Sequence, residues 1–316
     1  MSEQQKKIDV IVIGGGVGGL SAAQYAARAG LTIHLFEELA PGGQILTVDG
    51  LENYPGFEEP INGFELSEKF AKQAENFGAV IHYAGVSEIR QNKDHSFSVT
   101  TDDGEFTSSA VIMATGAKIR ELGIAGEQEY KGKGVSYCAT CDGPFFKGRR
   151  ILVVGGGDAA CGESQFLAKL SDQIVIIHRR DRFRAQKSLA DRVANNENIE
   201  IRFMHTLKEI KGDGDKITSV VLHDLENDKE YEDNFDAVFV FIGSDPRTKL
   251  VPNALIDEGG YIITDEKMAT NIKGLFAIGD VRNTPFRQIV TSASDGAIAA
   301  HAASEYIDEL KGQAYI

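Results

Sequence analysis

The sequence predicts an α/β fold that contains two similar units, each built from a strand, a glycine-rich turn, a helix and a second strand. The first unit reads IDVIVIGGGVGGLSAAQYAARAGLTIHLFEE, and the second reads RRILVVGGGDAACGESQFLAKLSDQIVIIHRR. The apolar runs VIVI and ILVV are typical of buried parallel strands, and the Ala-rich runs after the glycines favour helices. A glycine turn between such a strand and helix indicates dinucleotide binding, so we predict two Rossmann-like, three-layer domains.

Composition and charge narrow the possible functions. The chain has 316 residues, 42% of them hydrophobic and 25% charged, and a formal net charge of −14 at pH 7. Such a chain can bury a large core and has room for about two domains. Nucleic acid and anionic membrane surfaces are unfavourable partners, because both require clustered Lys and Arg. The polar start lacks a signal-peptide core and no stretch reaches the ~18 apolar residues that span a bilayer, so we expect a cytoplasmic protein with reduced thiols.

The first glycine turn fits the pattern GxGxxG with Gly14, Gly16 and Gly19. The first glycine allows a tight turn, the second admits a pyrophosphate, and the third lets the helix pack closely on the strand. Glu37 ends the following strand, where its carboxylate can accept hydrogen bonds from ribose hydroxyls but repels a 2′-phosphate. The first unit is therefore predicted to bind FAD or NAD and not NADP.

The second unit carries a basic cluster where the first has its acidic residue. Its glycine turn is a GxGxxA variant made by Gly155, Gly157 and Ala160. The cluster, in the stretch HRRDRFR, consists of His178, Arg179, Arg180 and Arg184. We expect Arg184, four residues past Arg180, to lie on the next helical turn. Guanidinium groups bind phosphate oxygens in pairs, so the cluster predicts recognition of the 2′-phosphate of NADPH, with a solvated basic patch as the alternative.

A further signal lies near the C-terminus. The stretch GLFAIGD reads as a short buried strand that ends at Asp280, and the Ala-rich run from about Ser292 reads as a helix. On pattern alone this segment is a strand, a loop and a helix.

Nearly the whole chain resembles the bacterial low-molecular-weight thioredoxin reductases. Besides the two glycine turns, the shared motifs are PGGQ at 41–44, ENYPG at 52–56, ATG at 114–116, CATCDG at 138–143, HRRDRFRAQK at 178–187, AIGD at 277–280 and RQIVTSASDG at 287–296. The resemblance implies an FAD domain in two pieces, 1–117 and 246–316, with an NADPH domain, 118–245, inserted between them. It also implies a homodimer.

The resemblance extends the two sets of cofactor-binding residues. Beyond the first glycine turn and Glu37, FAD would be held by Gly43, Gln44, Asn53, Thr115, Gly116, Asp280, Arg287, Gln288 and Ile289. Beyond the second turn and the basic cluster, NADPH would also be held by Asp158. The chain departs from the usual family pattern at Gly162, a glycine inside a helix that should cost about 1 kcal/mol relative to Ala, and at Arg247.

The stretch GVSYCATCDGPFFKG contains Cys138 and Cys141 with two residues between them. A redox dithiol, half of a zinc site and an ordinary turn are the possible interpretations. Zinc needs about four ligands, yet the third cysteine of the chain, Cys161, lies beside the second glycine turn and suits a buried helix position. CxxC dithiols cycle readily between thiol and disulfide, which favours the redox interpretation. Asp142 is either the group that donates a proton to the dithiol or a turn residue.

With these residues the resemblance implies transfer of a hydride from NADPH to FAD and of electrons to the Cys138–Cys141 disulfide. The dithiol then reduces thioredoxin or a similar small dithiol protein by exchange. Alternatives of similar fold are a reductase fed by ferredoxin or another flavin and a dithiol oxidase that uses oxygen. The basic cluster disfavours both. A binding module that holds a dinucleotide structurally would leave the CxxC without a role.

Overall fold

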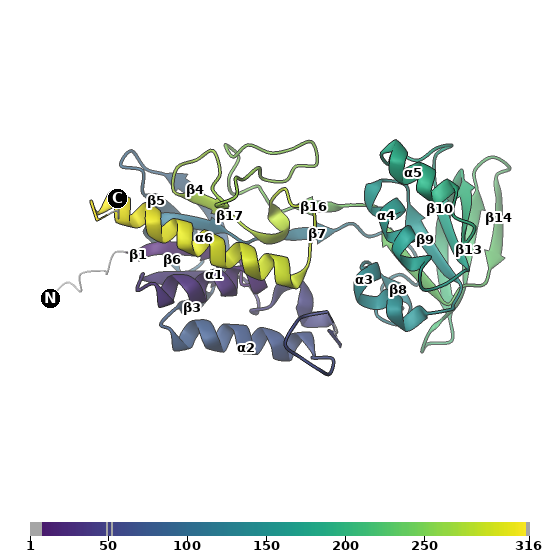
Figure 1. Ribbon diagram of the computed structural model, residues 1–316, viewed down its shortest axis with the longest axis horizontal. Helices are drawn as coiled ribbons and strands as arrows, with labels where there is room; N and C mark the ends of the chain where they lie inside the picture. Colours follow the sequence, from purple (N-terminus) through teal and green to yellow (C-terminus); the bar gives the residue numbers. More distant parts are fainter. Residues whose placement is uncertain (1–7, 49, 52, 314–316) are drawn as a thin grey trace. The chain divides into compact units, whose positions relative to one another are not determined.

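The computed structural model describes residues 8–48, 50–51 and 53–313, and the chain divides into two compact units (Figure 1). The first unit comprises Met1–Lys118 and Asp245–Ile316, and the second comprises Ile119–Ser244. Each limit lies one residue from the domain limit expected from the sequence. In Figure 1 the first unit combines the purple start of the chain with its yellow end, whereas the second unit is teal to green.

The first unit is built on a mixed sheet with the strand order β3-β2-β1-β6-β5-β4, and β17 pairs with β6. The strands are β1 (Ile8–Ile13), β2 (Ile33–Glu37), β3 (Val80–Tyr83), β4 (Val86–Gln91), β5 (Phe97–Thr101), β6 (Gly104–Met113) and β17 (Leu275–Ala277). β1 runs parallel to β2 and β6, and β17 runs parallel to β6, whereas β4, β5 and β6 are antiparallel. The run VIVI thus lies in the predicted buried parallel strand.

Side chains alternate between the two faces of this sheet. Val10 and Val12 belong to a core shared with the helices α1 (Val17–Arg28), α2 (Gly63–Asn76) and α6 (Ile289–Leu310), and Ile11 and Ile13 belong to a second core. α1 packs closely on α6 because glycines meet at the contact. A Cβ atom at Gly296 would lie 2.3 Å from the carbonyl oxygen of Gly18. Any larger residue at Gly296 would force the two helices apart.

The C-terminal segment differs in detail from the prediction. β17 ends at Ala277, and Asp280 lies in the short helix η3 (Gly279–Val281). α6 begins at Ile289, three residues before the expected start. The reason is a capping box at Gln288, whose backbone N–H donates to the Thr291 hydroxyl at 3.1 Å. This local hydrogen bonding starts the helix before the apolar pattern does.

The second unit repeats the parallel arrangement, with the strand order β11-β10-β9-β15-β8. Its strands are β8 (Val135–Ser136), β9 (Ile151–Gly155), β10 (Ile174–His178), β11 (Ile199–Phe203) and β15 (Ala237–Phe241). One face packs on the helices α4 (Asp158–Leu167) and α5 (Lys187–Ala194), and the other on an antiparallel sheet of β12 (His205–Gly212), β13 (Ile217–Asp224) and β14 (Lys229–Asp233). The unit therefore has three layers, and the predicted α/β fold class is confirmed.

The chain crosses between the units twice, and the two crossing strands, β7 (Ala117–Ile119) and β16 (Ser244–Pro246), pair with each other. Within the described ranges, no helix has the length and apolar character needed to cross a membrane.

Candidate active site

The first glycine turn is tight on one side and open on the other. Gly14 has a φ of +103°, and a Cβ atom there would lie 2.4 Å from the carbonyl oxygen of Ala114. Gly19 packs on the turn as closely, since its Cβ would lie 2.0 Å from the carbonyl oxygen of Gly14. A Cβ at Gly16, which caps α1, would meet nothing within 4 Å. A phosphate group can therefore approach the N-terminus of α1 beside Gly16.

Glu37 lies against this turn. Its Oε2 accepts a hydrogen bond from the Gly15 backbone N–H at 2.7 Å, and its Oε1 accepts one from the Leu39 N–H at 3.2 Å. Both oxygens keep further lone pairs, so the carboxylate can also accept hydrogen bonds from ribose hydroxyls. The arrangement suits a dinucleotide without a 2′-phosphate.

Two of the predicted residue pairs are brought together from segments far apart in the sequence. Gln44 donates from Nε2 to Asp280 Oδ2 at 3.3 Å, and Asn53 donates from Nδ2 to Gln288 Oε1 at 3.0 Å. Burial raises the pKa of Asp280, although the Arg287 charge and the Gln44 hydrogen bond oppose this shift. Asp280 follows β17, which ends in register with β1 and β6, and this edge is where open α/β sheets bind ligands.

Arg287 completes this region. Its guanidinium carbon lies 4.0 Å from the ring centroid of Tyr261, and its buried Nε has no hydrogen-bond partner among the described residues. Ile289 follows as the first residue of α6. A buried donor without a partner is costly in a folded protein. A bound polar group would relieve this cost, so the residues here fit FAD.

The remaining predicted residues of the first unit shape its backbone. A Cβ at Gly43, which begins the short helix η1 (Gly43–Thr47), would lie 3.4 Å from the Gly16 Cα. The Thr115 hydroxyl donates to the Arg247 carbonyl oxygen at 2.8 Å, and the Arg247 N–H donates to the Gly116 carbonyl oxygen at 3.0 Å. Arg247 thus holds the segment between β6 and β7 through its backbone, a role that does not depend on its side chain.

The second glycine turn has the same construction. A Cβ at Gly155 would lie 2.4 Å from the Phe241 carbonyl oxygen and 2.7 Å from the Ala160 Cβ, so both positions require small residues. A Cβ at Gly157, which caps α4, would meet nothing within 4 Å. The open side of the turn again faces the N-terminus of a helix, as phosphate binding requires.

The basic cluster lies beside this turn. Burial, followed by the charges of Arg180, Arg184 and Arg179, lowers the pKa of His178. The three arginines are exposed, whereas the His178 Nε2 is buried and has no hydrogen-bond partner among the described residues. A neutral imidazole with a free polar atom, surrounded by exposed guanidinium groups, fits a phosphorylated ribose.

The expectation that Arg184 lies on a helical turn is wrong. Residues 179–186 form a bent loop, and α5 begins at Lys187. Two contacts fold this loop back on the glycine turn: the Arg184 N–H donates to the Gly156 carbonyl oxygen at 2.7 Å, and the Gln186 N–H donates to Asp158 Oδ1 at 2.7 Å. Gln186 Nε2 also donates to Asp158 Oδ2 at 3.3 Å. Asp158 therefore anchors the basic loop, a contact between distant residues that sequence periodicity does not reveal.

The CxxC lies in the second unit, after β8: Cys138 caps the short helix α3 (Ala139–Asp142), which contains Cys141 and is followed by η2 (Gly143–Phe146). Cys138 and Cys141 form a disulfide with their Cα atoms 5.3 Å apart. The Cys141 backbone N–H donates to Cys138 Sγ at 3.2 Å, and the Thr140 Oγ1 lies 3.5 Å from the same sulfur. The pair thus has a geometry that supports oxidation and reduction.

Asp142 is partly buried next to the disulfide. Burial raises the pKa of this carboxyl group, and a hydrogen bond from the Ser136 hydroxyl at 2.6 Å opposes the shift. A carboxyl group with a raised pKa holds its proton at higher pH and can donate it. Ser136 was not singled out in the sequence, because its contact with Asp142 depends on how α3 folds back on β8.

Glu127 is a second residue that the sequence did not indicate. It is 1% exposed, and its carboxylate accepts hydrogen bonds from the backbone N–H groups of Leu122 and Gly123 at 2.8 and 2.7 Å. The Tyr137 hydroxyl donates to it at 2.9 Å, and burial, followed by this hydrogen bond, raises the pKa of Tyr137. Glu127 therefore connects the segment after β7 to the residue that precedes Cys138.

The third cysteine is free and lies in a helix of the second unit. Cys161 is buried in α4, and burial together with the Asp158 charge raises the pKa of its thiol to about 11. In the part of the chain that the structure describes, no group of three or more His, Cys, Asp and Glu side chains could hold a metal ion. Cys161 thus occupies the buried helix position predicted from the sequence.

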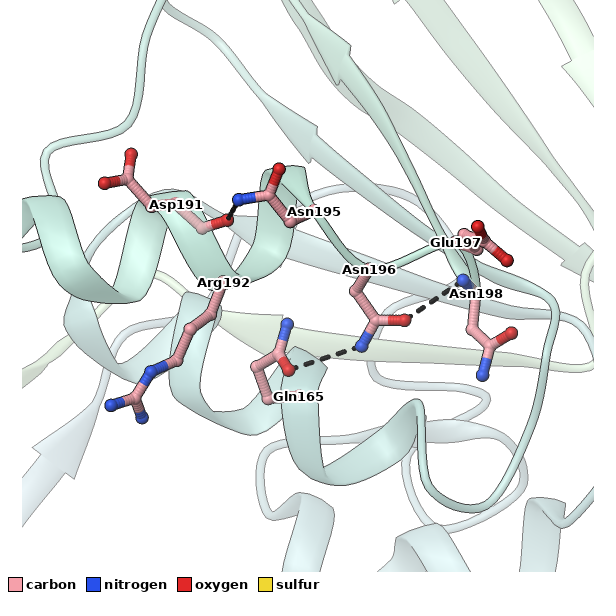
Figure 2. A pocket seen from close by; sticks show the side chains of 7 residues that line it. All are labelled: Gln165, Asp191, Arg192, Asn195, Asn196, Glu197 and Asn198. Carbon is pink, nitrogen blue, oxygen red and sulfur yellow. Dashed lines mark hydrogen bonds between the residues drawn. The ribbon is translucent and has the colours of Figure 1, made fainter.

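A polar hollow of about 580 Å³ lies elsewhere on the second unit (Figure 2). Gln165, in the last turn of α4, and Asn196, beyond α5, share a hydrogen bond of 3.3 Å across it. Because α4 begins at the glycine turn, this hollow is at the opposite end of the helix from the expected phosphate site.

The pyridine nucleotide-disulphide oxidoreductase family matches residues 8–300 of the chain. The chain belongs to this family. Within it, the chain is 52% identical over 303 residues to thioredoxin reductase of Treponema pallidum, covering 96% of this chain and 98% of the relative. It is 43% identical to thioredoxin reductase of Bacillus subtilis over 98% of both chains.

Solved structures of thioredoxin reductases are also similar to this chain. Thioredoxin reductase from Streptococcus pyogenes is 40% identical with a TM-score of 0.89, covering 96% of this chain and 99% of that one. The Lactococcus lactis enzyme is 43% identical with a TM-score of 0.65, covering 96% and 100%. The resemblance inferred from the motifs is confirmed, and membership of the family implies FAD and NADPH as cofactors.

Proposed function

We propose that this chain is an NADPH-dependent thioredoxin reductase that uses FAD. The observation that carries the proposal is the Cys138–Cys141 disulfide, which lies beside a carboxyl group of raised pKa in the same unit as the basic cluster. Its relatives of 43–52% identity are thioredoxin reductases. The protein partner is thioredoxin.

The first unit would bind FAD, and the second NADPH. For FAD we propose the residues Gly14, Gly16, Gly19, Glu37, Gly43, Gln44, Asn53, Thr115, Gly116, Asp280, Arg287, Gln288 and Ile289. For NADPH we propose Gly155, Gly157, Asp158, Ala160, His178, Arg179, Arg180 and Arg184. The open N-termini of α1 and α4 and the buried unpartnered atoms of Arg287 and His178 support this assignment. When bound, the two cofactors supply hydride transfer and pass electrons to the disulfide.

The residues of the chain provide three functions around that chemistry. The basic cluster selects the 2′-phosphate, since paired guanidinium groups match phosphate oxygens. Asp142 delivers a proton as the disulfide is reduced, because its raised pKa keeps a larger fraction of the group protonated. The Cys138–Cys141 dithiol then reduces the disulfide of thioredoxin by exchange, and returns to the oxidised state.

The alternatives of similar fold make different use of the second unit. An oxygen-dependent dithiol oxidase and a ferredoxin-fed reductase have no need of a site for a phosphorylated ribose. The exposed arginines and the neutral His178 beside an open glycine turn therefore favour NADPH.

An anaerobic titration of the FAD-loaded protein tests the proposal. NADPH should bleach the flavin absorbance rapidly, NADH should do so poorly, and oxidised thioredoxin should restore the absorbance. If dithionite reduces the flavin but NADPH does not, the assignment of the basic cluster is wrong.

We also propose, from membership of the family, that the protein is a cytoplasmic homodimer. Light scattering during size-exclusion chromatography would measure the mass of the assembly, and a mass near the 34.3 kDa of one chain would contradict the dimer.

A further inference from the structure

Ser136 occupies a fixed position beside the disulfide. It is the last residue of β8, aligned with Phe239 of the neighbouring β15, and is 4% exposed. Its hydroxyl donates to Asp142 Oδ2 at 2.6 Å, and its Oγ accepts the backbone N–H of Cys138 at 3.1 Å. The Cys138 carbonyl oxygen lies 3.3 Å from the same Oγ. One buried hydroxyl therefore contacts both the carboxyl group and the backbone of a redox cysteine.

These contacts suit both protonation states of Asp142. A hydroxyl group has one proton to donate and two lone pairs to accept with. When Asp142 is a carboxylate, Ser136 donates to it. When Asp142 is protonated, its O–H can donate to Ser136, and the Ser136 proton can turn to the Cys138 carbonyl oxygen. In either state the Cys138 N–H stays hydrogen-bonded, so gain or loss of the proton leaves no buried polar group without a partner.

We propose that Ser136 is a positioning residue for proton transfer at this dithiol: its hydroxyl holds the Asp142 carboxyl group, with or without its proton, in one orientation relative to Cys138. The proposal rests on the reductase function proposed above. In the step that it serves, the Cys138–Cys141 bond takes up the electron pair that comes from NADPH and breaks. Asp142 gives its proton to one sulfur and becomes a carboxylate, which leaves one thiol and one thiolate, and solvent then reprotonates Asp142.

The electrostatics of the site agree with this role. Burial raises the pKa of Asp142, and the hydrogen bond from the Ser136 hydroxyl opposes this shift. Loss of that hydrogen bond should therefore raise the pKa of Asp142 further.

The variant Ser136→Ala tests the proposal, with Ser136→Thr to restore a hydroxyl. Ser171→Ala is a matched control. Ser171 is also buried in the second unit, and its hydroxyl also contacts backbone, donating to the Arg149 carbonyl oxygen at 2.6 Å and accepting from the Gln173 N–H at 3.2 Å. Both of its partners lie outside the dithiol segment, so its loss reports only the general cost of removing a buried hydroxyl.

The first measurement is the pKa of Asp142 by ¹³C NMR of its carboxyl carbon in the oxidised, FAD-loaded protein, with Asp142→Asn to identify the signal. We expect Ser136→Ala to raise the pKa by about one unit, a tenfold change in proton affinity. Ser136→Thr should return it towards the wild-type value, and Ser171→Ala should leave it unchanged. An unchanged pKa in folded Ser136→Ala, or an equal shift in Ser171→Ala, would overturn the proposal.

The second measurement is the rate of disulfide reduction by NADPH, followed anaerobically as a function of pH. Ser136→Ala should slow this step by about ten- to a hundredfold and move its pH dependence in the same direction as the measured pKa. A slower rate with an unmoved pH profile would indicate a structural role only and refute proton positioning. The NMR titration needs neither NADPH nor thioredoxin, so a failure of the proposed function would be seen separately, as wild-type protein that does not reduce thioredoxin.

Discussion

Replacing Glu127 by Ala should loosen the segment that leads to the dithiol. The change removes the acceptor for three donors, the backbone N–H groups of Leu122 and Gly123 and the Tyr137 hydroxyl, from a site that is 1% exposed. A buried donor without a partner costs about 1–3 kcal/mol. Water can enter the space left by the side chain and accept hydrogen bonds from some of the three donors. We therefore expect the free energy of local unfolding to fall by about 2–4 kcal/mol.

Hydrogen exchange followed by mass spectrometry on peptides that cover residues 120–138 measures this cost locally. At about 1.4 kcal/mol for each factor of ten, the protected amides of Glu127→Ala should exchange about 30- to 700-fold faster than in wild type. Tyr137→Phe, which removes one of the three hydrogen bonds, should show a much smaller effect. Glu121→Ala is the matched control, because that glutamate is exposed and its carboxylate lies 3.8 Å from the Lys131 ammonium group. Exchange in Glu127→Ala that equals exchange in Glu121→Ala would refute the reasoning.

Three further substitutions have expected outcomes. Gly162→Ala should raise the free energy of unfolding of the second unit by about 0.5–1 kcal/mol, because a Cβ atom there would meet nothing within 4 Å. Urea denaturation measures this change, and a loss of stability would show that the helix needs glycine at this position. Gln186→Ala removes the side-chain hydrogen bond to Asp158 Oδ2 and keeps the backbone N–H bond to Oδ1, so it should weaken 2′,5′-ADP binding only about twofold in calorimetry. Binding of 5′-ADP should stay unchanged, and equal weakening of both would contradict a role of the loop in phosphate recognition. Asp142→Asn should slow disulfide reduction by about 10²–10⁴-fold. Burial raises the pKa of Asp142 above its unfolded value of 3.8, so the wild-type protein should lose stability as pH rises through the folded-state pKa. Asp142→Asn should not show this loss, and parallel stability profiles of the two proteins would contradict the reasoning.

The sequence predicted those parts of the site that are set by local backbone geometry. Gly14 needs a positive φ, and Gly155 lies too close to a carbonyl oxygen for any side chain, so the spacing of the glycines alone predicts both turns. The parallel strands that flank them followed from uninterrupted apolar runs. The proximity of Cys138 to Cys141 followed from their separation of three positions.

The parts that the sequence left open depend on tertiary contacts. The local sequence pattern does not predict the contact between Gln44 and Asp280, which are 236 positions apart. They meet because β1, β6 and β17 end together at one edge of the sheet. Arg184 was expected on a helical turn, because spacing alone does not show that Asp158 binds Gln186 and holds the segment as a loop. Ser136 and Glu127 were overlooked for the same reason: an ordinary serine and glutamate acquire a role only through burial and partners.

The packing of α6 on α1 has a consequence for biosynthesis. The N-terminal half of the first unit leaves the ribosome before the 126 residues of Ile119–Ser244 and long before α6. At about 5–20 residues per second, translation of that insertion alone takes about 6–25 s. During this time the face of α1 that Gly296 will cover stays exposed in the nascent chain. The second unit is one uninterrupted segment of the chain, so it can fold as soon as that segment has been synthesised. The inserted unit should therefore reach its native state first, and a chaperone that binds the nascent protein should bind the N-terminal half.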